Sequence, residues 1–430
     1  MFESLLIAFY TDLLVFVLCT FTLFKYGKLS ILHPATTYLT FHLFVFTSRL
    51  GLLILGAKVF LSEQTSYFSE IQNHELVKAV LLADVGFIAM TIAWVLEMNR
   101  KVNKNRVDSP ILLDSSVVRN VLFFTIPLGI WGIFSQLYIP FLGKNQADFG
   151  AWQDSSYLVN TQNWLFLSLL IIVFIKGFQK YSVVLIGVCL FILTFQGQHR
   201  YRILIPCVFL LMLYLYRQQK KWIPLKIVFL ILFGVVVFLP MKYIGKLVQQ
   251  GATITELIEF SSEYGESLAL GANADFSFLD MYASTLTLIE QSSGYYYGST
   301  YLTLFLAPIP RQFWENKPSL MQWMTDISTT NRNLRELGAV ATLYGESYAN
   351  FGYLGIFFIP FLLAKYSTRW YKNVTHTHPQ SANLFLYLYF TAISVQIYRD
   401  GLNAIFMFLW VYNMPGFAVY IFSILKQKRA

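Results

Sequence analysis

The stretch "SLLIAFYTDLLVFVLCTFTLF", residues 4–24, is one long apolar run that contains a single charged residue, Asp12. At a rise of about 1.5 Å per residue, a helix of this length crosses the roughly 30 Å of hydrocarbon in a bilayer. The N-terminus lacks the basic segment and the small-residue cleavage site that mark a removable signal peptide. We therefore expect this run to persist as a membrane-spanning helix.

Similar apolar runs recur along the whole chain, which has 430 residues and is 56% hydrophobic and only 13% charged. A chain of this composition cannot hide its apolar surface in a water-soluble core. The sequence predicts an all-α polytopic integral membrane protein with about eleven spans, near 4–24, 34–56, 76–97, 118–140, 161–178, 181–198, 203–217, 224–241, 343–364, 383–399 and 402–425. We divide it into spans 1 to 8 (1–241), a large, partly helical outer loop (242–342) and spans 9 to 11 (343–430).

The basic residues predict the orientation of these spans. If Lys25 and Lys28 are cytoplasmic, alternation of the spans places every other strong basic cluster on the same side, as the positive-inside rule requires. These clusters are Arg100, Lys101, Lys104 and Arg106; Lys176 and Lys180; Arg217, Lys220 and Lys221; Lys365, Arg369 and Lys372; and Lys426, Lys428 and Arg429. The N-terminus is then outside and the C-terminus cytoplasmic. The net charge of +9 indicates membrane orientation rather than nucleic-acid binding.

Several familiar site motifs are absent from the sequence. The three cysteines lie in apolar runs without CxxC spacing, which supports neither a disulfide framework nor a zinc site. The chain also lacks a GxxxxGK[ST] phosphate loop, HExxH, GxSxG, a GxGxxG between strand and helix, and a DxD pair. We predict no metal ion and no cofactor.

Ionisable residues within the predicted spans need partners, because a charge in hydrocarbon is costly. Asp12, Arg49 and Asp84 all lie about seven or eight residues from the outer end of their spans, a depth of roughly 10–12 Å. One interpretation pairs Arg49 with Asp84 or Asp12. The other places all three at the edge of an outward-facing polar cavity.

The outer loop contains two distinctive segments. Residues 251–270, "GATITELIEFSSEYGESLAL", place apolar and acidic residues on different helical stripes, typical of an interfacial amphipathic helix or of a solvated acidic face. Residues 295–310, "YYYGSTYLTLFLAPIP", are too short for a comfortable crossing, so we predict a re-entrant or interfacial segment.

Arginines in the predicted outer connections suggest an anionic ligand. His199, Arg200 and Arg202 lie between spans 6 and 7, Arg399 lies beside Asp400 between spans 10 and 11, and Arg311 lies in the outer loop. A guanidinium can grip a phosphate in two places, so their convergence would suit a diphosphate. Each arginine alone can instead anchor at lipid headgroups, and Arg399 can pair with nearby acids.

Two motifs resemble the bacterial oligosaccharide repeat-unit polymerases, the Wzy-type polymerases of O-antigen and capsule. In that family a Y-G segment leads into an "iPR..w..KP" element, and "GE.Y.NFG..G" opens the next span. The matching residues here are Tyr297, Gly298, Pro310, Arg311, Trp314, Lys317 and Pro318, then Gly345, Glu346, Tyr348, Asn350, Phe351, Gly352 and Gly355. We expect the last two glycines, three apart on one helix face, to allow close helix contact.

The resemblance implies a GT-C-like fold and a metal-independent glycosyltransferase in the bacterial cytoplasmic membrane. Such an enzyme moves a glycan en bloc from undecaprenyl pyrophosphate onto a lipid-linked acceptor at the outer face, and a partner protein can regulate chain length. The candidate general base is Glu346 or His199. The candidate substrate-binding residues are Arg200, Arg202, Arg311, Arg399, Lys317, Trp314, Tyr297 and Tyr348.

Two other functions remain open at this stage. An O-antigen ligase would share the lipid donor, the outward arginines and the large outer loop, and would differ in its acceptor. A flippase or other transporter of lipid-linked glycans would form no glycosidic bond. For a transporter we would expect charges through the midplane of several spans and internal repeats.

Overall fold

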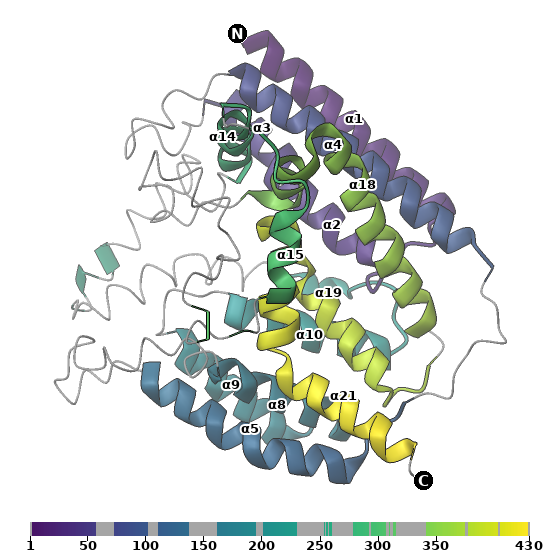
Figure 1. Cartoon of the computed structure of the whole chain (residues 1–430), viewed down its shortest axis with the longest axis vertical. Helices are drawn as coiled ribbons and strands as arrows, with labels where there is room; N and C mark the ends of the chain where they lie inside the picture. The colour runs from purple at the N-terminus through teal and green to yellow at the C-terminus, as the bar shows by residue number, and fades with distance from the viewer. Residues whose placement is uncertain are drawn as a thin grey trace. The chain divides into compact units, whose positions relative to one another are not determined.

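The computed structural model describes ten longer stretches and several isolated residues. These are residues 2–56, 73–101, 111–136, 161–194, 201–229, 278–291, 294–306, 341–374, 377–402 and 405–428, with 253, 255–256, 258–259, 309 and 313–314. Every regular element within these ranges is a helix, and their β pairing is limited to one isolated bridge between Leu112 and Ser381. The predicted all-α class is confirmed for this part of the chain (Figure 1).

Within the described residues, five helices are long and apolar enough to cross a membrane: Glu3–Tyr26, Pro34–Ile54, Asn73–Asn99, Ser115–Ile133 and Thr342–Val374. Two shorter apolar helices cover Gln162–Lys176 and Lys180–Leu190. Together with the composition, these helices define an α-helical membrane protein. The count of eleven spans stays a prediction, since most of the candidate span 224–241 lies outside the described residues.

The chain forms two compact units, of which unit 1 comprises residues 1–102, 265–372 and 394–406. Its elements are α1 (Phe2–Tyr26), α2 (Pro34–His42), the π-helix η1 (Leu43–Thr47), α3 (Ser48–Ile54), α4 (Asn73–Asn99), α14 (Phe278–Gln291), α15 (Ser299–Leu306), most of α18 (Thr342–Val374) and the end of α19 (Ala382–Asp400). Helix α1 lies along α4 (Figure 1). The two run in the same direction, because Asp12 lies beside Asp84 and Cys19 beside Thr91.

The core of unit 1 is dominated by aromatic side chains. The rings of Tyr38, Phe46, Phe87, Trp94 and Tyr344 are fully buried and in mutual contact. A glycine makes one of these contacts possible: a Cβ at Gly86 on α4 would collide with the Tyr344 ring. This close approach holds the start of α18 against the middle of α4.

Helix α18 is broken near its beginning. Phe351 has φ −137° and ψ 15°, and Gly352 has φ 60° and ψ −143°, neither of which is helical. Glycine suits this position both for its positive φ and because a Cβ would lie 2.9 Å from the Tyr295 ring. The prediction that Gly352 and Gly355 share one helix face is therefore wrong, because the helix is interrupted at Gly352. A Cβ at Gly355 would meet the Ser347 carbonyl oxygen across the break.

Unit 2 comprises residues 103–264, 373–393 and 407–430. Its elements are α5 (Ser115–Gln136), α8 (Gln162–Lys176), α9 (Lys180–Thr194), α10 (Tyr201–Arg217), α21 (Met414–Gln427), the beginning of α19 and most of the π-helix η7 (Phe406–Val411). Helix α5 packs closely on α8, where a Cβ at Gly129 would lie 2.6 Å from the Leu165 nitrogen. Asp114 caps α5 by accepting hydrogen bonds from the backbone N–H groups of Ser116 and Val117.

Candidate functional site

Four of the residues that the sequence nominates lie outside the described residues: His199, Arg200, Arg311 and Lys317. Arg202 opens α10 in unit 2, where it is buried and its guanidinium lies 5.7 Å from the centre of the Tyr201 ring. Arg399 belongs to unit 1. The convergence of these arginines on one ligand therefore stays a prediction.

Glu346 is fully buried one turn into α18, with an exposed fraction of 0%. Its carboxylate oxygen Oε2 accepts a hydrogen bond from the backbone N–H of Leu402, in the turn that follows α19. Gly401, with φ 86°, brings the backbone so close that a Cβ there would collide with Oε2. The turn and the Glu346 carboxylate therefore fix one another.

Arg399, in the last turn of α19, forms a double hydrogen bond with its neighbour Asp400. The guanidinium Nε donates to Oδ1 at 2.6 Å and Nη2 donates to Oδ2 at 3.1 Å. The alternative in which Arg399 pairs with a nearby acid is confirmed. The Arg399 side chain remains partly exposed, so its positive charge still contributes to the electrostatic potential at the protein surface near this turn.

Asn350 joins the two motifs of the polymerase resemblance. Its amide oxygen accepts hydrogen bonds from Gly298 N–H and the Thr300 hydroxyl, both at 3.0 Å, and its amide nitrogen donates to the Glu346 carbonyl at 2.9 Å. The helix break also frees backbone carbonyls: Ala349 O accepts from Tyr296 N–H and Asn350 O from Tyr297 N–H. The Y-G segment is thereby bound directly to the "NFG" segment.

Tyrosines surround this junction. Their rings meet edge to face, Tyr295 with Tyr297 and Tyr348, and Tyr348 with Tyr353. We call these four side chains the tyrosine surface; Tyr297 is 78% exposed, whereas Tyr348 is buried. The Tyr348 hydroxyl donates to Glu290, which also forms an ion pair with Lys78. Flat aromatic faces beside polar groups suit a sugar, which has both apolar and hydroxyl-bearing faces.

Trp314, the remaining aromatic residue among the predicted substrate-binding residues, is half-exposed. Of its neighbours in sequence, the structure describes Phe313. Within unit 1, Tyr297 and Tyr348 lie at the break in α18, and Glu346 contacts the turn that follows α19. Arg399 lies at the end of α19. Sequence reasoning singled out Asn350 only as a motif position. An asparagine within a predicted apolar span, two residues before a glycine, was the available signal for its linking role.

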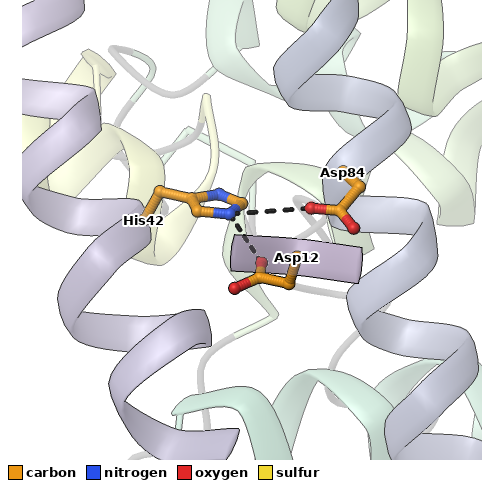
Figure 2. Close-up of side chains that lie close together, drawn as sticks. All are labelled: Asp12, His42 and Asp84. Carbon is orange, nitrogen blue, oxygen red and sulfur yellow. Dashed lines mark hydrogen bonds and ion pairs between the residues drawn. The ribbon is translucent and has the colours of Figure 1, made fainter. Parts of the chain in front are cut away.

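A second polar cluster lies inside unit 1, where the structure corrects the predicted pairing of Arg49. Arg49 pairs with Asp280 of α14 rather than with Asp84 or Asp12. Those two aspartates instead flank His42 (Figure 2). His42 was missed because only charged residues were sought in the spans, although any ionisable side chain in an apolar run is a candidate.

No family model, curated protein or solved structure that was compared with this chain matches it.

Proposed function

We propose that this protein is a membrane glycosyltransferase that polymerises lipid-linked oligosaccharide repeat units at the outer face of the bacterial cytoplasmic membrane. The observation that supports the proposal most is the hydrogen bonding of Asn350 to Gly298 and Thr300. These residues belong to two sequence segments that together resemble Wzy-type polymerases. Because the segments are about fifty residues apart, their direct contact favours a common site over a chance match.

The proposed reaction joins two lipid-linked glycans. A hydroxyl of the acceptor attacks the anomeric carbon of the donor, the bond from that carbon to the pyrophosphate oxygen breaks, and polyprenyl pyrophosphate leaves. The hydroxyl proton passes to a base, for which Glu346 and His199 are the candidates. Guanidinium groups stabilise the negative charge that develops on the leaving group, without a metal ion.

The geometry around Glu346 sets a condition on its role as base. Because the carboxylate is buried and accepts the Leu402 N–H, an acceptor can reach it only if the turn at 399–402 moves. Such a movement would present Arg399 and Glu346 to the substrates together. In the closed arrangement described here, Glu346 serves to position the turn.

The tyrosine surface is the proposed contact for the acceptor glycan. Tyr297 offers the most exposed ring, next to the backbone that is fixed by Asn350. A sugar stacked on Tyr297 would therefore lie next to other residues of the motifs that resemble the polymerase family. Stacking of this kind tolerates different sugars, since it uses ring faces rather than specific hydroxyls.

The test uses the purified full-length chain in lipid nanodiscs with lipid-linked repeat units, a lipid A core acceptor and no added metal ions. We expect a ladder of elongated lipid-linked glycans. Transfer only to a lipid A core would instead indicate a ligase, and translocation without new glycosidic bonds a transporter; either result would refute the proposal.

Two variants relate this activity to the site. Tyr297→Ala should shorten the ladder or raise the acceptor concentration needed for half-maximal rate. The control is Phe305→Ala on α15, which removes an aromatic ring of similar exposure and should have neither effect. Glu346→Gln keeps the size of the side chain and removes its basicity. Normal turnover by Glu346→Gln would transfer the base assignment to His199.

A further inference from the structure

Three membrane-spanning segments bring Asp12, His42 and Asp84 together inside unit 1 (Figure 2). The imidazole Nε2 of His42 lies 2.9 Å from Asp12 Oδ1 and 3.7 Å from Asp84 Oδ1. Asp12 belongs to α1, His42 to the end of α2 and Asp84 to α4. All three side chains are buried, and at most 5% of any of them is exposed.

Three of the four carboxylate oxygens in this cluster receive no hydrogen bond. Asp12 Oδ2 and both oxygens of Asp84 are buried without a hydrogen-bond partner among the described residues. A buried carboxylate oxygen that receives neither a proton nor a cation is strongly unfavourable. The cluster therefore lacks a positively charged component.

The charge of the cluster indicates the size of that component. Two carboxylates and one neutral imidazole sum to −2, and Arg49, which is buried in the same unit, is already held by Asp280. One divalent cation makes the cluster neutral. Two bound protons would do the same, one on the imidazole and one shared by the carboxylates.

The distances accommodate the cation, although the shorter one is also that of an ordinary hydrogen bond between the imidazole and Asp12. A four-coordinate metal with ligands at about 2.0–2.1 Å holds its ligand atoms about 3.3 Å from one another. The two Nε2 to oxygen distances, 2.9 and 3.7 Å, lie on either side of this value. A mixed set of imidazole and carboxylate ligands suits Zn²⁺ and similar divalent transition metals rather than Na⁺ or Mg²⁺.

The other ring nitrogen of His42, Nδ1, has the hydrogen-bond partner that is usual for a metal-bound histidine. His42 Nδ1 lies 3.0 Å from the Tyr38 hydroxyl, which in turn hydrogen bonds with the Tyr344 hydroxyl. If Nδ1–H donates to Tyr38 and Tyr38 donates to Tyr344, the lone pair of Nε2 faces the carboxylates. An outer hydrogen bond that fixes the ring in this way is usual for metal-bound histidine.

The backbone at His42 is also unusual. Helix α2 ends at this residue and the π-helix η1 begins at the next one. Short π-helical segments occur frequently at functional sites, because the wider turn re-aims side chains. Here the wider turn follows the one histidine that faces both aspartates.

We propose that Asp12, His42 and Asp84 bind one divalent transition-metal ion, represented by Zn²⁺, which ties α1, α2 and α4 together. Its role is structural, and the glycosyl transfer proposed above uses no metal. No local sequence motif marks this site, because each ligand comes from a different span. This proposal does not depend on the proposed function, since metal binding is measured without glycan substrates.

The first test is equilibrium dialysis of the purified, metal-stripped full-length protein in nanodiscs against Zn²⁺. We expect one ion per chain, loss of that ion in Asp84→Asn, and retention in Thr91→Val, which removes another buried polar group two turns further along α4. Tyr38→Phe removes the hydroxyl that orients His42 and should weaken binding about 10- to 100-fold. Folded wild-type protein that binds no stoichiometric Zn²⁺ would overturn the proposal and leave two protons as the neutralising charge.

The second test identifies a ligand directly. In Asp84→Cys, bound Co²⁺ should show a near-ultraviolet thiolate-to-metal charge-transfer band that the wild type lacks. Ala89→Cys, another buried position on α4, is the matched control and should show no new band. The same band in both variants, or in neither while Co²⁺ is bound, would contradict ligation at residue 84.

Discussion

The guanidinium of Arg49 holds the carboxylate of Asp280 with two hydrogen bonds, from Nε to Oδ1 at 3.1 Å and from Nη2 to Oδ2 at 2.6 Å. Both side chains are fully buried. Asp280 lies within residues 242–342, which the sequence assigned to an outer loop. Helix α14, which contains it, contributes to the core of unit 1 and packs against α4 and η1.

Breaking this pair should destabilise the protein strongly. Arg49→Ala or Asp280→Ala leaves the other charge buried without its partner, at a cost of about 3–5 kcal/mol. The double variant Arg49→Met/Asp280→Leu removes both charges and should recover most of the loss. Thermal unfolding in detergent measures the effect; a double variant as unstable as the sum of the two single variants would contradict it.

Removing the link made by Asn350 should detach the Y-G segment. Asn350→Leu leaves Gly298 N–H and Thr300 without their acceptor, whereas Asn350→Asp keeps an acceptor oxygen at that place. We expect faster hydrogen exchange over 294–306 and loss of long glycans in Asn350→Leu, with partial retention in Asn350→Asp. Equal exchange in the wild type and Asn350→Leu would show that the link does not hold the segment.

A methyl group at Gly86 should separate α18 from α4. The added Cβ collides with the Tyr344 ring, a rigid and fully buried group, so the expected cost of Gly86→Ala is about 1–3 kcal/mol. The combined change Gly86→Ala/Tyr344→Leu creates space and should restore part of the stability. The melting temperatures of both variants decide this, and an unchanged melting temperature in Gly86→Ala would refute the close contact.

The charge of Asp114 should stabilise unit 2 in a pH-dependent way. The Ser116 hydroxyl, the Lys426 ammonium and the Val117 N–H hold the pKa of the Asp114 carboxyl below its usual value. Its stabilising effect is therefore complete above the ordinary aspartate pKa and is lost as the pH falls through the lower, folded-state pKa.

Two variants separate the charge from the cap. Asp114→Asn keeps a side chain that caps α5 and removes the charge, whereas Asp114→Ala removes both. We expect the melting temperature of Asp114→Asn to be below that of the wild type at neutral pH and to approach it in acid. A difference that stays constant from pH 7 to pH 3 would exclude this linkage.

The long apolar helices were predictable because each of these runs is long enough to be recognised on its own, whereas α14 was not predicted. Residues 34–56 were predicted as a span, and α2, η1 and α3 occupy Pro34–Ile54. The π-helical turn after His42 could not be predicted, because it depends on neighbours from other spans. The break at Gly352 was also missed, since "NFGYLG" fits a helix contact motif equally well.

The candidate site was predictable where its parts are close in sequence. Glu346 and Asn350 lie one turn apart, and both belong to a recognisable motif. The partners of Arg49 and His42 were not predictable, because a single sequence gives the depth of a residue in its span but not its direction. Arg49, Asp12 and Asp84 have similar depths, yet Arg49 faces α14 and the two aspartates face His42.

The distance along the chain between Arg49 and its partner affects how the protein is made. Asp280 follows Arg49 by 231 residues, and at about 5–20 residues per second the ribosome needs roughly 10–50 s to reach it. During this interval the charge of Arg49 must be stabilised by the insertion machinery, by lipid headgroups or by another acidic residue. Asp12, His42 and Asp84 are by contrast all synthesised within the first three predicted spans, so their site can assemble early and serve as a template for the later helices.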